Sequence, residues 1–222
     1  VANTTGRDVL DFHHETATIK GRDGQYLYGA TYKEREIEIQ VKLTGFTDLG
    51  MRRQYERLNR LLFSRKAKKL VFGDDPERYY KAIFSKVTKR YLEDAYDTLI
   101  KLQFICHDPF KYTEPKTATT NKITYNGDFP TEPILRLTTQ AGSEIRILHL
   151  ETQKYIRLKA TYIQGSNLLV NCETREIKLN DRNELMNFDM VNSRYFKLQK
   201  GVNTFQVVGA LLNSIEYKEV FA

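Results

Sequence analysis

Apolar and polar residues alternate strictly from Glu36 to Leu43, and this pattern is the clearest structural signal in the chain. The apolar and polar members form two separate sets: Ile37, Ile39, Val41 and Leu43 against Glu36, Glu38, Gln40 and Lys42. A period of two over this length predicts a strand with one buried face and one solvated face. Shorter alternating runs follow at 69–72, 80–86 and 99–106. The first half therefore predicts a mainly antiparallel sheet or β-sandwich.

The spacing changes to that of an amphipathic helix after Thr47 and Asp48, either of which can cap it. One apolar stripe is predicted to pack on the sheet: Met51, Tyr55, Leu58, Leu61 and Leu62. Arg53, Arg57 and Arg60 occupy the opposite face. The first half thus combines an antiparallel sheet with one packed helix.

The segment before the alternating strand is less regular. Its candidate inward positions are Val9, Leu10, Phe12 and Ile19. Residues 21–24 read GRDG, which predicts a turn, and an apolar patch follows at Tyr26, Leu27 and Tyr28. This patch is either an exposed subunit interface or a surface folded back on the sheet. The adjacent pair His13 and His14 would point to opposite sides of a strand, so we expect no metal site there.

A composition change after residue 110 predicts a domain boundary. Residues 111–124 are rich in Thr, Lys, Pro and Asn without apolar periodicity. We therefore expect an N-terminal domain at 1–112, a linker at 113–130 and a C-terminal domain at 131–222. The last domain predicts a β-sandwich of short strands. Its expected strands are 134–137, 145–147, 155–158, 168–172, 176–179, 195–198, 204–208 and 214–220.

The net charge of +7 has a local origin. Residues 52–69 hold eight of the 35 Lys and Arg residues and one of the 28 Asp and Glu residues, so the remainder carries 27 of each. A basic patch on a neutral body is consistent with nucleic acid, an acidic partner or a solvated surface. Few aromatic residues interleave with these bases, which disfavours nucleic acid.

Candidate chemistry is sparse. The chain contains no P-loop, GxGxxG, HExxH or GxSxG motif, and no zinc-site spacing. Cys106 and Cys172 lie in apolar runs and are predicted to be buried thiols rather than a disulfide. No signal peptide or membrane-length apolar run is visible. We expect no enzyme activity, metal or cofactor. The chain does not begin with Met, so we expect it to be processed or trimmed.

Several blocks, taken in order, resemble siphophage distal tail proteins. They are GRDGQYLYGATYKEREIEI at 21–39, the basic helix, CHDPFKY at 106–112, GDFPTEPI at 127–134 and NCETREIKLN at 171–180. The resemblance covers nearly the whole chain, and none of these blocks is catalytic. The first strand that family members usually carry before this point is expected to be missing ahead of Val1.

The resemblance implies a structural role at the virion tail tip, after assembly in the host cytoplasm. An N-terminal domain would form a hexameric ring below the tail tube protein and above a tail-associated lysin or baseplate protein. A C-terminal galectin-like β-sandwich would dock receptor-binding proteins or side fibres and so serve host attachment. The candidate subunit-interface residues are Tyr26, Leu27, Tyr28, Arg53, Arg57 and Arg60.

Two other functions compete with this interpretation. The C-terminal sandwich could be a carbohydrate-binding module, but Trp is absent, and Tyr155, Tyr162 and Tyr195 fit structural roles equally well. The basic segment 52–69 could bind nucleic acid, which predicts an affinity that falls steeply with salt. No membrane partner is expected.

Overall fold

The computed structural model describes residues 3–94 and 97–222. The described chain is mainly β, as predicted, with a single α-helix among these residues. It divides into two compact units: an N-terminal unit that ends at Lys111 and a C-terminal unit, Tyr112–Phe221. Each has its own hydrophobic clusters.

The N-terminal unit is built on an antiparallel sheet with the strand order β1-β4-β7-β6, and β5 also pairs with β6. These strands are β1 (Asn3–Thr5), β4 (Arg35–Thr44), β5 (Lys68–Phe72), β6 (Asp75–Asp94) and β7 (Asp97–Cys106). The alternation predicted for β4 is confirmed, because Ile37, Ile39 and Leu43 are buried while Glu36 and Lys42 are exposed.

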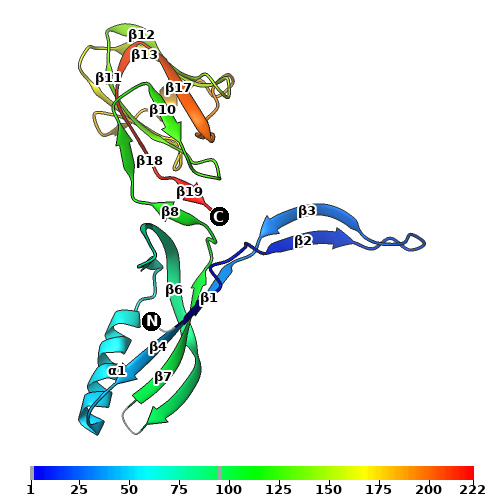
Figure 1. The fold of residues 1–222 in the computed structure, drawn as a ribbon. Coiled ribbons are helices and arrows are strands. Elements are labelled where there is room, and N and C mark those ends of the chain that lie inside the picture. Colours follow the sequence, from blue (N-terminus) through cyan, green and yellow to red (C-terminus); the bar gives the residue numbers. More distant parts are fainter. Residues whose placement is uncertain (1–2, 95–96) are drawn as a thin grey trace. The chain divides into compact units, whose positions relative to one another are not determined.

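Helix α1 (Asp48–Leu62) lies along β4 (Figure 1). The Thr47 side chain caps it by accepting a hydrogen bond from the Gly50 amide at 3.0 Å. Four members of the predicted stripe pack against the sheet: Met51, Tyr55, Leu58 and Leu62. The prediction was wrong for Leu61, which is 66% exposed. At about 100° per residue, Leu61 is roughly a quarter turn away from the centre of the stripe.

Strands β2 (Phe12–Ala17) and β3 (Tyr26–Tyr32) form a separate two-stranded sheet, the arm, which leaves the main sheet in Figure 1. Of the four inward positions predicted within residues 1–20, only Leu10 is buried. Val9, Phe12 and Ile19 are exposed, so that prediction was wrong for them. No second layer of the N-terminal unit covers the described arm. Both faces of this two-stranded sheet are therefore exposed.

The C-terminal unit is a β-sandwich whose core lies between two antiparallel sheets. One has the order β10-β17-β12-β13 and the other β16-β15-β14-β11-β18-β9. Its longer strands are β11 (Ile134–Thr139), β12 (Gly142–His149), β13 (Lys154–Tyr162), β14 (Asn167–Asn171), β15 (Glu176–Leu179), β17 (Gly201–Val208) and β18 (Ala210–Tyr217). The short elements are β16 (Arg182–Asn183), the 3₁₀ helix η1 (Leu185–Asn187) and β19 (Val220–Phe221).

Residues 195–198, predicted as a strand, are irregular. Their only backbone β-bridge to another described segment is the isolated one between Leu198 and Thr131. Phe196 and Leu198 are nevertheless buried. An irregular segment that covers the end of the core therefore produced the same alternation as a strand.

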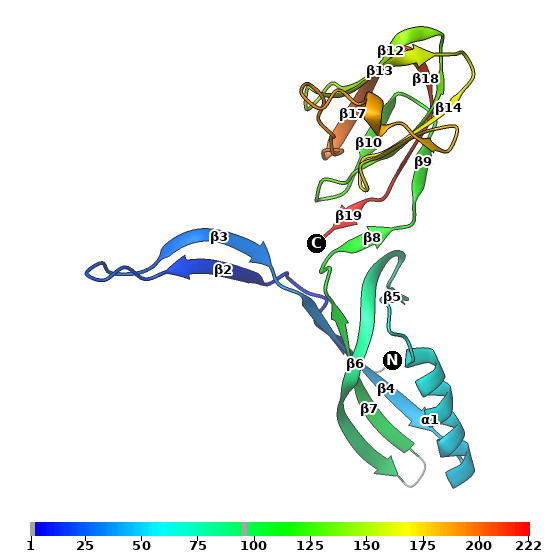
Figure 2. The same cartoon turned by 180° about the vertical axis from the view of Figure 1, so that it is seen from behind.

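The linker predicted at 113–130 was also wrong. The chain there contains β8 (Lys111–Thr113), β9 (Lys116–Ala118) and β10 (Lys122–Tyr125), all visible in Figure 2. Strand β9 pairs with β18, and β10 pairs with β17. Ile123 and Tyr125 are buried in the sandwich core. The prediction failed because the segment is mostly polar and the alternation in β10 has only these two apolar side chains.

Candidate assembly interfaces

The arm presents the predicted patch to solvent. Tyr26, Leu27 and Tyr28 are 44%, 61% and 71% exposed, so they do not fold back on the sheet. The register passes from Glu15 opposite Gly29 to Thr16 opposite Leu27, which leaves Tyr28 without a cross-strand partner residue. A bulge of this kind bends a strand and redirects a side chain. It places the most exposed of the three side chains at an irregularity in β3.

Two contacts of aromatic rings lie within the arm, and neither buries it. The Phe12 and Tyr32 rings face each other across the strands, 4.6 Å apart. Near the turn, the Arg22 guanidinium lies 3.8 Å from the centre of the Tyr26 ring. A two-stranded hairpin is at best marginally stable in water. The apolar surface of the arm is therefore available to a partner.

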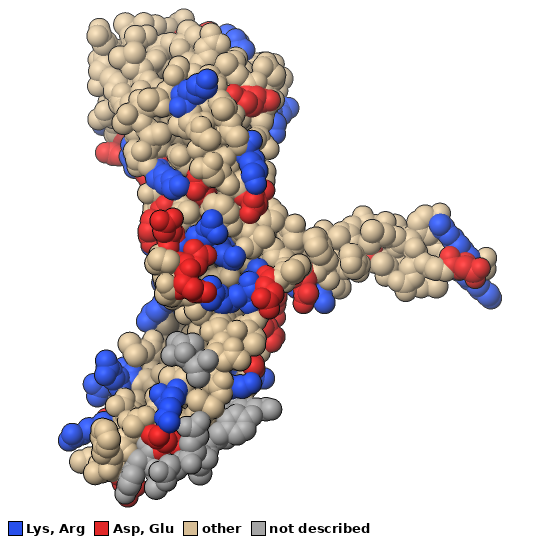
Figure 3. Space-filling model, in the orientation of Figure 1, with Lys and Arg blue, Asp and Glu red and all other residues tan. Residues whose placement is uncertain are grey.

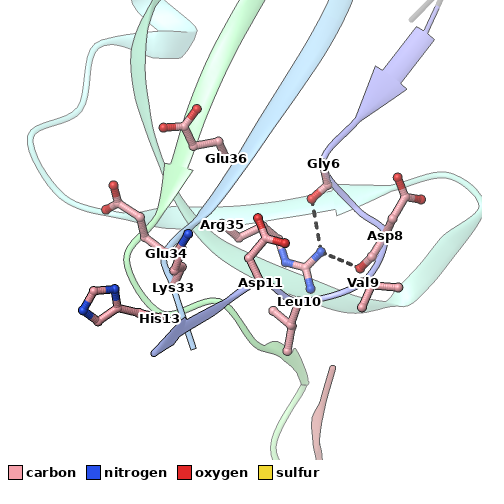
Figure 4. A pocket seen from close by; sticks show the side chains of 10 residues that line it. All are labelled: Gly6, Asp8, Val9, Leu10, Asp11, His13, Lys33, Glu34, Arg35 and Glu36. Atoms are coloured by element: carbon pink, nitrogen blue, oxygen red, sulfur yellow. Dashed lines mark hydrogen bonds between the residues drawn. The ribbon is translucent and has the colours of Figure 1, made fainter. Parts of the chain in front are cut away.

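Arg35 anchors the arm to the sheet. Its side chain is buried, and Nε donates to the Pro109 carbonyl at 3.0 Å. Nη1 donates to the carbonyl oxygens of Gly6 and Asp8 at 3.1 and 3.0 Å. Figure 4 shows Arg35, Gly6 and Asp8 among the residues that line a hollow of about 610 Å³ at the base of the arm. One guanidinium thus joins the turn after β1, the start of β4 and the segment after β7.

The guanidinium groups of Arg7 and Arg35 lie over aromatic rings. The Arg7 guanidinium lies 4.0 Å from the centre of the Phe72 ring and donates to Asp74 at 2.8 Å, which lowers the pKa of that carboxyl. Arg35 lies 5.4 Å from the centre of the Tyr80 ring. Burial raises the pKa of the Tyr80 hydroxyl. Stacking on rings stabilises guanidinium groups whose remaining N–H donors lack an oxygen acceptor.

Arg35 was not among the residues predicted from the sequence, although its position carries a signal. Arg35 has the same parity as Ile37 and Ile39, so the alternation places it on the buried face of β4. A charged residue on the buried face requires partners within the fold. The same reasoning finds His149, which shares the buried parity of Ile145 and Ile147 on β12.

Arg53, Arg57 and Arg60 lie on the exposed face of α1, as the stripe predicted. None of the three forms an ion pair with another described residue. Lys and Arg gather over α1 in Figure 3. This face therefore carries a net positive charge, although the Glu56 carboxylate lies among the three arginines.

The tyrosines considered for saccharide binding have structural roles. Tyr162 is buried and donates to Glu184 at 3.3 Å. Tyr195 stacks on Phe188 at 5.3 Å. Tyr155 is half-buried, with the Arg146 guanidinium 4.5 Å from its ring centre. Each of these rings thus has a partner within the fold.

Metal and membrane features are absent from the described part of the chain. His13 and His14 occupy successive positions of β2, and no group of three or more His, Cys, Asp or Glu side chains there could hold a metal. No helix among the same residues is long and apolar enough to cross a membrane.

Cys106 and Cys172 are buried free thiols, as predicted, and burial raises their pKa values to about 11 and about 12.

Comparison with known families accounts for nearly the whole chain. Residues 3–106 match the family described as phage tail protein RIFT-related domain. Residues 126–221 match the siphovirus-type tail component, C-terminal domain. The distal tail protein of Bacillus phage SPP1 is 27% identical over 214 residues, a match that covers 92% of this chain and 84% of that protein.

Solved structures agree on the fold. The crystal structure of the SPP1 distal tail protein, described as a hub of the adsorption apparatus, superposes with a TM-score of 0.84 at 23% identity. That superposition covers 100% of this chain and 93% of the other. A chain of the phage P2 baseplate in its activated conformation gives 0.50 at 11% identity, over 99% and 89%. The chain therefore belongs to the siphophage distal tail protein family: it is a structural component of the virion tail tip, and not an enzyme.

Proposed function

We propose that six copies of this chain form a closed ring at the tail tip and that the arm makes the contact between neighbours. The observation that carries this proposal is the exposure of Tyr26, Leu27 and Tyr28 on a ribbon without a covering layer. Exposed aromatic and aliphatic residues at such a position are typical of an interface core. A partner that covered the arm would supply the burial that the ribbon lacks.

A ring also requires that each copy use two different complementary surfaces. The arm is one surface, since it is a projection of the N-terminal unit. The second is a surface of that unit that accepts the arm of the next copy. Such a contact repeats from copy to copy. The ring closes if a whole number of these rotations between neighbours makes a full turn.

The partners of the ring follow from the tail-tip role. The N-terminal unit would stack between the tail tube protein and a tail-associated lysin or baseplate protein. The basic face with Arg53, Arg57 and Arg60 is suited to acidic residues of a neighbouring ring. The C-terminal unit would dock receptor-binding proteins or side fibres and thereby connect the hub to host attachment.

The ring proposal is tested by solution mass from light scattering, with negative-stain images of the main peak. We expect a six-copy particle for the unaltered chain and smaller species for Leu27→Asp and Tyr28→Asp. Leu211→Asp is the matched control, because Leu211 is 58% exposed and lies on β18 of the C-terminal unit. Particles of unchanged mass in both arm variants would contradict the assignment of the arm to the contact.

A further inference from the structure

An apolar cleft opens where α1 ends. It lies between the helix and β5 and has a volume of about 170 Å³. Leu61 and Leu62 line it from the helix, while Ala82, Phe84 and Phe104 line it from the sheet. This cleft, the α1–β5 cleft, is distinct from the arm and from the hollow around Arg35.

The cleft exists because two hydrophobic clusters meet without a side chain to close the gap between them. One cluster lies under α1 and includes Leu58 and Leu62, and the other lies under β5 and includes Leu70. Phe104 packs against both. The next apolar side chain after the helix, Phe63, is 80% exposed and therefore does not cover the gap.

The rim of the cleft is basic. Lys66, Lys68 and Lys69 border it, and all three are exposed. Neither Lys66 nor Lys68 forms an ion pair with another described residue, and Lys69 lies over the Tyr79 ring at 4.6 Å. Among the described residues that line the cleft, none is Asp or Glu. Apolar walls and the three lysines of segment 66–69 at their edge define the chemistry of the occupant.

The size and polarity together select one class of partner. A cavity of about 150 Å³ lined by aliphatic and aromatic side chains accommodates a benzene ring, so this cleft can hold one aromatic or branched aliphatic side chain. Ammonium groups at the rim attract carboxylates on either side of that side chain. Nucleic acid would satisfy the rim through its phosphates but would leave the apolar walls without a partner.

We propose that the α1–β5 cleft is a docking site for an acidic segment of a partner protein, which inserts one bulky apolar side chain between α1 and β5. The segment lies across Lys66 and Lys68 and places its anchor against Leu62, Phe84 and Phe104. The hub role suggests that this partner is another tail protein. The binding site itself depends only on the folded N-terminal unit and does not require the ring.

The test uses the full chain and a fluorescent peptide with a central phenylalanine between runs of aspartate and glutamate, followed by fluorescence anisotropy. We expect saturable binding that weakens about tenfold or more when the phenylalanine becomes alanine. We expect a loss of similar size for the double variant Lys66→Glu with Lys68→Glu. The matched control is Arg53→Glu with Arg57→Glu, which makes the same charge change on the exposed face of α1 and should weaken binding about threefold at most.

Four results would overturn the proposal, three of them measured with the peptides alone. The first is no binding of the peptide, and the second is equal binding of the alanine peptide. The third is equal weakening by both charge-reversed variants, since a general electrostatic attraction would explain that outcome. A short DNA duplex that competes with the peptide for Lys66 and Lys68 would assign the rim to nucleic acid instead. The particle mass of each variant, measured in parallel, separates failure of this site from failure of the ring.

Discussion

Removal of the Arg35 guanidinium should loosen the base of the arm. Arg35→Met keeps much of the length of the side chain but abolishes all donors. The buried bond to Pro109 is worth about 2 kcal/mol as a charge-assisted hydrogen bond. The partly exposed bonds to Gly6 and Asp8 are worth about 1 kcal/mol each, because water replaces them in part. The local loss of stability is then about 4 kcal/mol.

Native-state hydrogen exchange measures this loss where it occurs. A loss of about 4 kcal/mol corresponds to roughly a thousandfold faster exchange of the amides of β1 and the first residues of β4. Strand β11 of the C-terminal unit should be unchanged and is the internal control. Arg22→Met is the matched variant, since Arg22 lies at the arm turn and stacks on Tyr26. Acceleration of less than about threefold at β1 in Arg35→Met would refute the anchoring role of Arg35.

Two further predictions concern the C-terminal unit. Burial lowers the pKa of His149 below its usual value of 6.5, so the folded unit binds this proton more weakly than the unfolded chain. The contribution of His149 to the free energy of unfolding should be complete above about pH 6.5 and should decrease as the pH falls below that value. Thermal unfolding at several pH values should therefore show a smaller loss of stability for His149→Gln at low pH. Identical pH dependence in both proteins would contradict this. Gly209→Ala should cost about 3 kcal/mol or more in urea unfolding, because φ is +78° and the new Cβ would overlap the Glu144 carbonyl oxygen. Gly165→Ala, at φ +91° with nothing nearby, should cost only about 1 kcal/mol, so equal costs would exclude the steric explanation.

The sequence by itself determined the elements that bury one face and expose the other. Strand β4 and helix α1 each contact one apolar layer, so their periods of two and 3.6 residues report burial directly. The two buried thiols and the exposed basic face of α1 follow from the same patterns. Local periodicity is sufficient to predict which side chains are buried wherever an element packs against a single apolar layer.

Only the tertiary structure decided the features that depend on distant partners. The arm is exposed because no second layer of its own unit covers it, and no local pattern records a missing layer. Strands β9 and β10 exist because β18 and β17 offer edges for pairing, although their own composition is that of a linker. Arg35 is an anchor because three separate carbonyl groups converge on it, from segments far apart in the chain. Convergence of this kind is a property of three-dimensional packing, which periodicity along one segment does not encode.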